Sequence, residues 1–286
     1  MGQDKINTQA IGLDVGLAFT KWLTGAENLH YGLWDGLEVS AANLRAAQEA
    51  YTDRLFALLP DRPCRILDIG GGAGETAKKL LALGHSVDIV VPSPFLAGRC
   101  RANAPAARVH ECMFEDFRAD PASFDICLFS ESFQYIPLDQ GLPKCLTLLA
   151  PGGEIIVADC FRTPEYTGDR LLAPVGGGHR IGAFREALAS LPLEVVSEED
   201  VTLSAAPSVE IEQGLFNVFG YGLTRVDQDL ARHKPRLRWV LHRVIRSLIS
   251  ARKRARLDQR LNQQARNREN FARFNIYLLM RLRPTA

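Results

Sequence analysis

The sequence predicts an α/β protein built on a doubly wound, mostly parallel, seven-stranded sheet. Short apolar runs alternate with helix-like stretches over residues 64–202, which is the pattern of parallel strands joined by right-handed helical crossovers. A glycine-rich segment directly follows the first apolar run, as expected of a sharp strand-to-helix turn. A last apolar run at 274–284 comes after a long excursion and supplies the seventh strand.

The elements follow in a regular order along the chain. Strands are expected at residues 64–70, 86–91, 107–114, 124–130, 152–161, 193–202 and 274–284. Helices are expected at 75–83, which Gly84 ends, at 94–104 and at 181–191. We therefore expect three parts: a helical N-terminal lid with an aromatic loop (1–60), a core (61–199 and 274–286), and a basic helical cap inserted before the last strand (200–273).

The composition is that of a globular cytoplasmic protein. Hydrophobic residues make up 47% and charged residues 23% of the 286-residue chain. No apolar run approaches the ~18 residues that would predict a transmembrane helix, and the N-terminus lacks the pattern of a secretory signal. The six cysteines are scattered without metal-ligand spacing, so we expect reduced thiols and no metal site.

The charge is unevenly distributed along the chain. Residues 1–224 hold 17 Lys and Arg against 29 Asp and Glu, whereas residues 225–286 hold 17 against 4. The two parts therefore carry net charges of −12 and +13, which give the overall charge of +1. The basic charge is concentrated in the last fifth of the chain.

The glycine segment "DIGGGAG" predicts a ligand site at the tip of the first strand. Gly70, Gly72 and Gly74 allow the backbone to turn sharply and a ligand to approach the N-terminus of the next helix. The dinucleotide fingerprint would need glycine where Glu75 stands. The carboxylate of Asp68 beside the glycines suits a ligand with an ammonium group, which S-adenosylmethionine has and nicotinamide dinucleotides lack.

With this motif the sequence resembles the class I methyltransferase family, whose first motif reads apolar-Asp-apolar-Gly-x-Gly-x-Gly. The resemblance covers most of residues 60–200 and the last strand, and implies a Rossmann-like fold with S-adenosyl-L-methionine as cofactor and S-adenosyl-L-homocysteine as product. Where the family usually has a ribose-binding acid, this chain has Val91; Asp88 comes three residues too early. The cofactor-binding residues implied by the resemblance are Tyr31, Asp68, Gly70, Gly72, Gly74, Ser93, Phe114, Glu115, Asp116 and Ser130.

Within the family, the chain is distantly similar to cyclopropane-fatty-acid synthases and sterol methyltransferases, which also have a neutral residue in place of that acid. Their third motif resembles "MFEDF", which implies that Phe114 stacks near the adenine and that Glu115 or Asp116 accepts from its amino group. Gln134 and Ala158 stand where the cyclopropanating subfamily has the Glu and His of its bicarbonate site. We therefore expect its cofactor architecture without its cyclopropanating base.

Candidate acceptor-side residues come from three segments. The aromatic loop "LHYGLWDG" resembles a loop that closes over the cofactor, with Tyr31 at the methionine carboxylate; a packed aromatic turn is the alternative. His179 is the first candidate for a general base because its ordinary pKa lies near neutrality, and a surface or N-capping histidine is the alternative. The candidates are His179, His30 and Tyr135 as catalytic residues, and Trp34, Gln134 and Arg180 as substrate-binding residues.

The basic segment "RLRWVLHRVIRSLISARKRARLDQRL" has apolar residues at helical spacing on one face and arginines on the other. It predicts a lid helix with a solvated basic face, or a site for anionic lipid, an anionic acceptor or an acyl carrier protein. Binding of nucleic acid is less favoured because the rest of the chain is acidic and only Trp239 is aromatic in this run.

Together these features predict a methyltransferase for a small hydrophobic or amphipathic acceptor, anionic acceptors included, with oxygen or carbon favoured over nitrogen as the methylated atom. Its expected location is the cytoplasm, with peripheral attachment to a membrane as an option. The alternatives are an RNA methyltransferase that uses the basic cap and a non-catalytic nucleotide-binding regulator.

Overall fold

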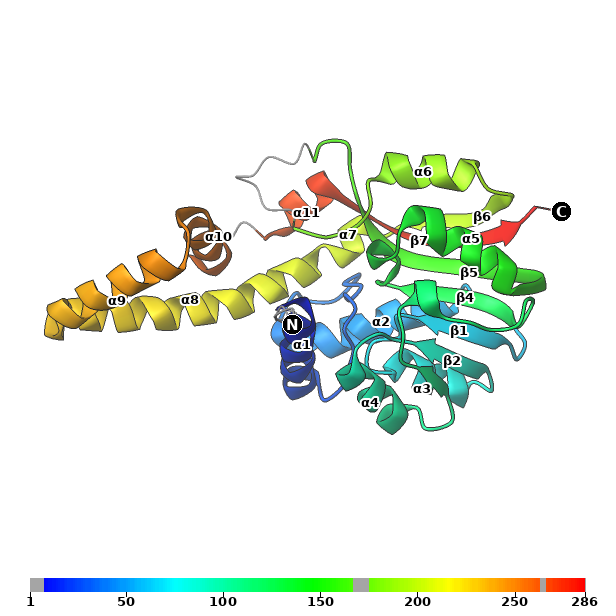
Figure 1. Ribbon diagram of the computed structural model, residues 1–286, viewed down its shortest axis with the longest axis horizontal. Coiled ribbons are helices and arrows are strands. Elements are labelled where there is room, and N and C mark those ends of the chain that lie inside the picture. Colours follow the sequence, from blue (N-terminus) through cyan, green and yellow to red (C-terminus); the bar gives the residue numbers. More distant parts are fainter. Residues whose placement is uncertain (1–7, 167–174, 263–265, 286) are drawn as a thin grey trace, which may run out of the picture.

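The computed structural model describes residues 8–166, 175–262 and 266–285. Its centre is a seven-stranded sheet in the order β3-β2-β1-β4-β5-β7-β6 (Figure 1). The strands are β1 (Arg65–Ile69), β2 (Ser86–Val90), β3 (Arg108–His110), β4 (Phe124–Ser130), β5 (Leu149–Arg162), β6 (Leu193–Asp200) and β7 (Asn275–Pro284). Only β7 runs antiparallel to its neighbours, so the predicted mostly parallel, seven-stranded sheet is confirmed.

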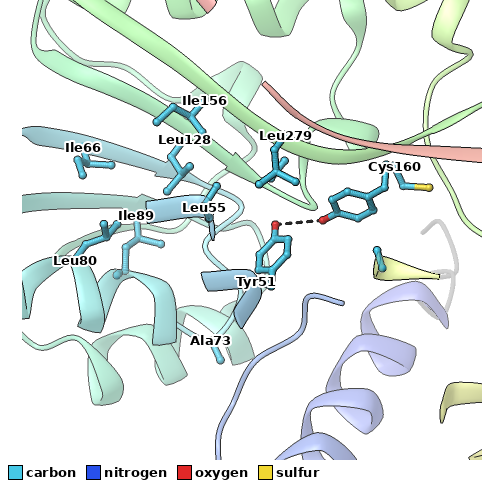
Figure 2. Packing of buried hydrophobic residues seen from close by; sticks show 14 of the residues in the cluster. Tyr51, Leu55, Ile66, Ala73, Leu80, Ile89, Leu128, Ile156, Cys160 and Leu279 are labelled. Atoms are coloured by element: carbon cyan, nitrogen blue, oxygen red, sulfur yellow. Dashed lines mark hydrogen bonds between the residues drawn. The ribbon is translucent and has the colours of Figure 1, made fainter. Parts of the chain in front are cut away.

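Helices cover both faces of the sheet because consecutive strand residues point to opposite sides. Ile66, Ile89 and Leu128 pack on one side with the helices α2 (Leu44–Phe56), α3 (Glu75–Ala82) and α4 (Pro94–Asn103). Figure 2 shows this layer, with Tyr51 and Leu55 of α2 against the strands. The alternate residues, such as Leu67 and Phe129, pack with α5 (Leu138–Leu148) and α6 (Ile181–Ala189). The sheet is therefore doubly wound.

One local prediction was wrong, and one helix was not predicted. The expected strand at 107–114 is only three residues long, and a 3₁₀ turn (Phe114–Asp116) follows it. Helix α5 was not predicted, because Pro143 lies inside it and an interior proline normally argues against a helix. Its apolar face nevertheless buries Leu142, Cys145 and Leu148 on the sheet, and this tertiary packing stabilises the helix despite the missing hydrogen bond.

The segment before the core contains two α-helices among its described residues; residues 1–7 lie outside the described part. Helix α1 (Thr8–Thr24) and α2 flank a loop that contains the aromatic segment 29–36. Glu27, which is nearly buried, accepts hydrogen bonds from Lys21 of α1 and from Arg99 and Asn103 of α4. These bonds fasten the N-terminal segment to the carboxyl edge of the sheet.

The segment between β6 and β7 is also helical; residues 263–265 of the predicted cap are not described. It contains α7 (Thr202–Ala205), α8 (Pro207–His233), α9 (Pro235–Leu248), α10 (Ala251–Asn262) and α11 (Arg268–Phe274). Helices α8–α10, here called the helical arm, extend away from the sheet instead of folding over it (Figure 1). Among the described residues, no helix is both long and apolar enough to cross a bilayer.

Candidate functional site

A cavity of about 680 Å³ lies at the carboxyl ends of the central strands. Its walls come from the tips of β1, β2 and β4, from the segments that follow them, and from the N-terminal segment. The sheet order reverses between β1 and β4, and this switch point is where open α/β sheets bind ligands. Ten of the sixteen predicted site residues line the cavity: His30, Asp68, Gly70, Gly72, Ser93, Phe114, Glu115, Ser130, Gln134 and Tyr135.

The glycine loop has the left-handed backbone that glycine tolerates best. Gly70, Gly72 and Gly74 have φ values of 77°, 54° and 86°. A β-carbon on Gly70 would lie 2.3 Å from Cβ of Ser132, and one on Gly74 would lie 2.9 Å from Cα of Cys100. A β-carbon on Gly72 would approach only Leu29, at 3.7 Å. Gly70 and Gly74 are thus required by packing against protein, whereas Gly72 faces the cavity.

Asp68 lies beneath this loop with an unused hydrogen-bonding atom. Its side chain is 1% exposed, and its Oδ2 has no hydrogen-bond partner among the described residues. Burial raises the pKa of Asp68 to about 7. A buried carboxylate without a partner is costly, so the site suits a ligand that brings a positively charged donor.

The other end of the cavity suits a flat ring with an exocyclic amino group. Phe114 lines the wall, and Oε2 of Glu115 is buried there without a hydrogen-bond partner in the described chain. Lys144 of α5 fixes this turn by donating to the backbone oxygens of Phe114, Glu115 and Phe117. Asp116 is exposed and lies outside the cavity wall. Of the two acids proposed for the adenine, the structure brings only Glu115 to the cavity.

At the end of β2 the wall is neutral. Val91 is buried and lines the cavity beside Ser93, whose hydroxyl caps the N-terminus of α4. Asp88 instead contacts Nε2 of His110 at 2.7 Å, between β2 and β3. The sequence correctly placed Asp88 away from the strand tip.

Glu131, which was not predicted as a site residue, lines the cavity directly after β4. Its Oε1 accepts hydrogen bonds from the backbone N–H of Tyr31 at 2.7 Å and the hydroxyl of Tyr277 at 2.9 Å. Its φ is 56°, a left-handed conformation that is uncommon outside glycine and is often found at functional sites. Burial raises the pKa of Glu131 to about 8, against the lowering effect of these two hydrogen bonds. The group therefore titrates in the range useful for acid–base catalysis.

His30 lines the same cavity and has a buried ring nitrogen without a partner among the described residues. Its Nδ1 donates to the backbone oxygen of Tyr31 at 2.8 Å, which leaves Nε2 as an acceptor without a partner among the described residues. The ring stacks on Tyr51 with centroids 4.3 Å apart. Burial lowers the pKa of His30 to about 4, so the ring is neutral near pH 7 and can accept a hydrogen bond from a ligand.

Tyr135 and Gln134 border the cavity beside Glu131. Tyr135 is 55% exposed, which places it at the rim. The side chain of Gln134 donates to Oδ1 of the fully buried Asp159 at 3.2 Å. Ser130 shares a hydrogen bond of 2.9 Å with the hydroxyl of Tyr51. Gln134 and Ser130 are thus held by protein groups at the wall.

Several predicted residues do not line the cavity. The ring of His179 contacts Phe133, and its Nε2 lies 2.9 Å from the backbone oxygen of Ile136. Arg180 is exposed where α6 begins. Trp34 is buried and donates from Nε1 to Ser208. The structure thus gives these residues packing and bonding roles beside the site.

The aromatic loop differs from the expectation that Tyr31 would contact the cofactor. Tyr31 packs edge-on against Phe271 and beside Tyr277, and its side chain is absent from the cavity wall. A β-carbon on Gly32 would lie 2.5 Å from Cβ of Ala47. The aromatic loop is therefore packed tightly on α2, and only its His30 end, with Asn28 and Leu29, reaches the cavity.

The residues that were missed differ in how strongly the sequence signals them. Glu131 could have been found, because an acid directly after a central parallel strand lies at the ligand edge of the sheet. Asp14 and Asn28 each bring a buried side-chain atom without a hydrogen-bond partner in the described chain to the cavity. They come from α1 and the loop after it, whose position depends on tertiary packing. In the described chain, no group of three His, Cys, Asp or Glu residues could hold a metal ion.

Comparisons with known proteins identify a methyltransferase domain in this chain. The family model described as a methyltransferase domain matches residues 66–153. An uncharacterized methyltransferase of Mycobacterium tuberculosis is 29% identical over 98 residues, which cover 34% of this chain and 40% of the relative. A ubiquinone biosynthesis O-methyltransferase of Xanthomonas euvesicatoria is 29% identical over 106 residues, which cover 35% and 44% of the two chains. The chain thus spans less than half the length of these relatives.

Solved structures show that the likeness in fold extends over nearly the whole chain. A geranyl diphosphate C-methyltransferase from Streptomyces coelicolor A3(2), in complex with Mg²⁺, geranyl-S-thiolodiphosphate and S-adenosyl-L-homocysteine, has a TM-score of 0.66 at 15% identity and covers 99% of both chains. A cyclopropane synthase from Mycobacterium tuberculosis has a TM-score of 0.68 at 13% identity and covers 98% and 99% of the two chains.

The residues fit the cofactor that this family uses. The glycine loop leaves room for a ligand at Gly72, and the unpartnered oxygens of Asp68 and Glu115 suit its ammonium and adenine amino groups. The matching domain covers the segment that supplies the glycine loop, Glu115 and Glu131. Residues 66–153 thus match a methyltransferase domain, and the fold of the chain is that of solved methyltransferase structures.

Proposed function

We propose that this protein transfers a methyl group from S-adenosyl-L-methionine to the hydroxyl oxygen of a neutral, largely apolar small molecule. The observation that carries this proposal is the position of Glu131. It is a cavity-lining carboxylate with a raised pKa, and His30, whose Nε2 has no partner among the described residues, lines the same cavity. Its chemistry is that of a general base.

The residues that would hold the cofactor form two groups, one at each end of the cavity. Asp68 and the amides of the glycine loop would hold the amino-acid end, and Phe114 and Glu115 would hold the adenine. Ser93 and Val91 line the wall at β2 and offer no carboxylate to the ribose. The bound cofactor supplies an activated methyl group, so positioning accounts for much of the expected rate.

The charges of the wall favour a neutral acceptor. No Lys or Arg occurs among the described residues that line the cavity, whereas six acids do: Asp14, Glu27, Asp68, Glu75, Glu115 and Glu131. A diphosphate or carboxylate acceptor would therefore meet carboxylates without a cation to pair with. This narrows the expectation from the sequence, which included anionic acceptors.

A hydroxyl acceptor follows from the base. The acceptor O–H would donate to Glu131, its oxygen would form the new bond to the methyl carbon as the carbon–sulfur bond breaks, and the proton would remain on Glu131. His30 would accept a hydrogen bond from a second polar group of the acceptor and orient it. The curated relative named as an O-methyltransferase supports oxygen as the methylated atom.

The test uses methyl-labelled S-adenosylmethionine with metabolites separated into neutral, anionic and RNA fractions. Label is expected in neutral, organic-extractable products, and Glu131→Gln should abolish it while S-adenosylhomocysteine still binds. Label confined to the anionic fraction would overturn the neutral acceptor. Label in RNA would favour the RNA methyltransferase, and cofactor binding without labelled product in any fraction would favour a non-catalytic regulator.

A further inference from the structure

We propose that the helical arm is a docking device for a membrane surface that contains anionic lipids, and that the apolar face of α9 enters the interface. This inference concerns the location of the protein and does not depend on which acceptor is methylated.

Helix α9 has a continuous apolar stripe that stays substantially exposed in the described structure. Six aliphatic residues recur at intervals of three and four: Leu237, Val240, Leu241, Val244, Ile245 and Leu248. Each is between 40% and 79% exposed, and no residue of α9 is buried. Exposed apolar surface of this extent on one helix marks an interaction site.

Basic residues are frequent in the segment that carries this stripe. Residues 234–262 contain ten Lys and Arg and one acid, Asp258, which gives a net charge of +9. On α9 itself, Arg236 and Arg243 flank the stripe and no acidic residue occurs. An aliphatic face with a basic polar side is the pattern of helices that lie in the interface of anionic bilayers.

The rotation of α9 is fixed, so the stripe is a permanent feature of the fold. Arg238 and His242 both bond to Asp227 of α8, at 2.8 and 2.7 Å. This side of α9 is therefore held against α8, whereas Val244 and Leu248 lie on the outward side. The surface needs no rearrangement before it binds.

The rest of the arm is braced as a unit. Gln213 of α8 donates to the backbone oxygen of Arg260 at 2.9 Å. The guanidinium of Arg260 lies 4.1 Å from the centroid of Phe216. A β-carbon on Gly220 would lie 2.2 Å from the backbone oxygen of Leu261, so α8 and α10 approach closely at this glycine.

The arm begins at the carboxyl edge of the sheet, which is also the edge where the cavity lies. Strand β6 is parallel to the central strands, and α7 and α8 follow its carboxyl end (Figure 1). The base of the arm is also bonded to the aromatic loop, because Trp34 donates from its backbone to Ser204 and from Nε1 to Ser208, both at 2.9 Å. Docking of α9 would therefore tether the sheet edge that carries the cavity to the bilayer through the arm.

A bilayer fits these features better than the other occupants. Pairing with the arm of a second copy would bring together two like-charged segments, each with a net charge of +9 over residues 234–262. Nucleic acid would use the arginines but would leave the aliphatic stripe exposed to water. An anionic membrane satisfies both the charge and the apolar face.

Vesicle flotation tests this directly, with vesicles of phosphatidylcholine alone or with about 30% phosphatidylglycerol. We expect binding to the anionic vesicles only. The variant Arg243→Gln/Arg246→Gln/Arg252→Gln should bind about a hundredfold more weakly, since each basic residue contributes about 1 kcal/mol at such a surface. Val244→Glu/Leu248→Glu should lose binding, whereas Leu83→Glu/Arg101→Gln, which changes exposed residues on the body, should bind as the parent does.

Calorimetry with S-adenosylhomocysteine shows separately that each variant is folded and keeps the cofactor site. The proposal is overturned if the parent protein does not bind anionic vesicles or if both arm variants bind them unchanged. It is also overturned if the stripe variant converts a dimer into a monomer in light scattering, since a second copy would then cover the stripe. RNA that binds the arm more tightly than anionic vesicles do would assign it to nucleic acid.

Discussion

The hydroxyl of Tyr277 donates a hydrogen bond of 2.9 Å to Oε1 of Glu131, although the two residues are 146 positions apart. This bond joins the antiparallel strand β7 to the tip of β4 across the neighbouring strand β5. The backbone of Tyr31 donates to the same oxygen. Three distant segments thus determine the position and pKa of one carboxylate in the cavity.

Replacing that carboxylate tests its chemical role. Glu131→Gln keeps the size of the side chain and removes its ability to accept a proton. We expect kcat to fall by about 10²–10⁴ because general base catalysis is lost, while the affinity for S-adenosylhomocysteine changes little. Steady-state kinetics and calorimetry measure the two effects. Unchanged kcat would exclude Glu131 as the base.

Tyr277→Phe separates positioning from chemistry. Its hydroxyl hydrogen bond lowers the pKa of Glu131 against the larger effect of burial. Removing the bond should raise that pKa further, so the pH at which kcat reaches half its plateau should move above about 8. Glu131 must be ionised to act, and kcat therefore rises with pH in both proteins. A variant with lower kcat and an unshifted pH profile would show that Tyr277 acts only through packing.

Cofactor binding should depend on the protonation of Asp68. Burial raises its pKa to about 7, and an ammonium ligand needs the ionised form. Below pH 7 the affinity for S-adenosylhomocysteine should therefore fall, approaching about tenfold per pH unit, and binding should release a proton. Calorimetry in two buffers with different ionisation enthalpies measures that proton. In Asp68→Asn we expect weaker binding without this pH dependence; persistence of the dependence would assign it to another group.

Much of the core could be predicted because its signals are local. The alternation of apolar runs gave the sheet, and the positions of Asp68 and Gly70 relative to the first strand gave the cofactor edge. Glu131 lies on a strand tip, so its location also had a sequence signal. Its pKa did not, because that depends on Tyr277 and on burial by distant segments.

The residues on the acceptor side of the cavity were harder to predict, because their roles also depend on contacts between distant segments. His179 and Trp34 have side chains that suit a site, but their hydrogen bonds go to protein groups beside the cavity. The same residue types serve packing and chemistry, and only the tertiary contacts distinguish these roles. The course of the arm likewise depends on contacts such as Asp227 with Arg238, which an amphipathic pattern alone does not specify.

Gly72 provides a selective test of the cofactor loop. A β-carbon there would meet no protein atom closer than 3.7 Å and would enter the cavity wall. We expect Gly72→Val to lose micromolar binding of S-adenosylhomocysteine with a modest loss of stability from its positive φ. Gly84→Val is the matched control, because Gly84 also has a positive φ (87°), a β-carbon there meets nothing within 4 Å, and the residue lies outside the cavity wall. Normal binding by Gly72→Val would remove the loop from the site.

The buried acids also predict how the stability of the ligand-free protein changes with pH. Burial raises the pKa values of Asp68 and Asp159 from 3.8 to about 7 and that of Glu131 from 4.5 to about 8. These groups hold more protons in the folded state than in the unfolded state, so their contribution is full below about pH 4 and is lost as pH rises toward 8. His30 opposes this only below its ordinary pKa of 6.5, because burial lowers its folded value to about 4.

Between pH 6.5 and 8.5 the three acids change stability without opposition from His30. In this range we expect the Tm of the ligand-free protein to fall as pH rises. Thermal unfolding followed by circular dichroism measures the slope. Asp68→Asn should make it shallower, because an amide does not titrate, and saturating S-adenosylhomocysteine should do the same by pairing its ammonium group with the carboxylate. A Tm that rises across this pH range would show that the three acids ionise in the folded protein as readily as in the unfolded chain. Burial would then not raise the pKa of Glu131, and the proposal that Glu131 is the base would lose its support.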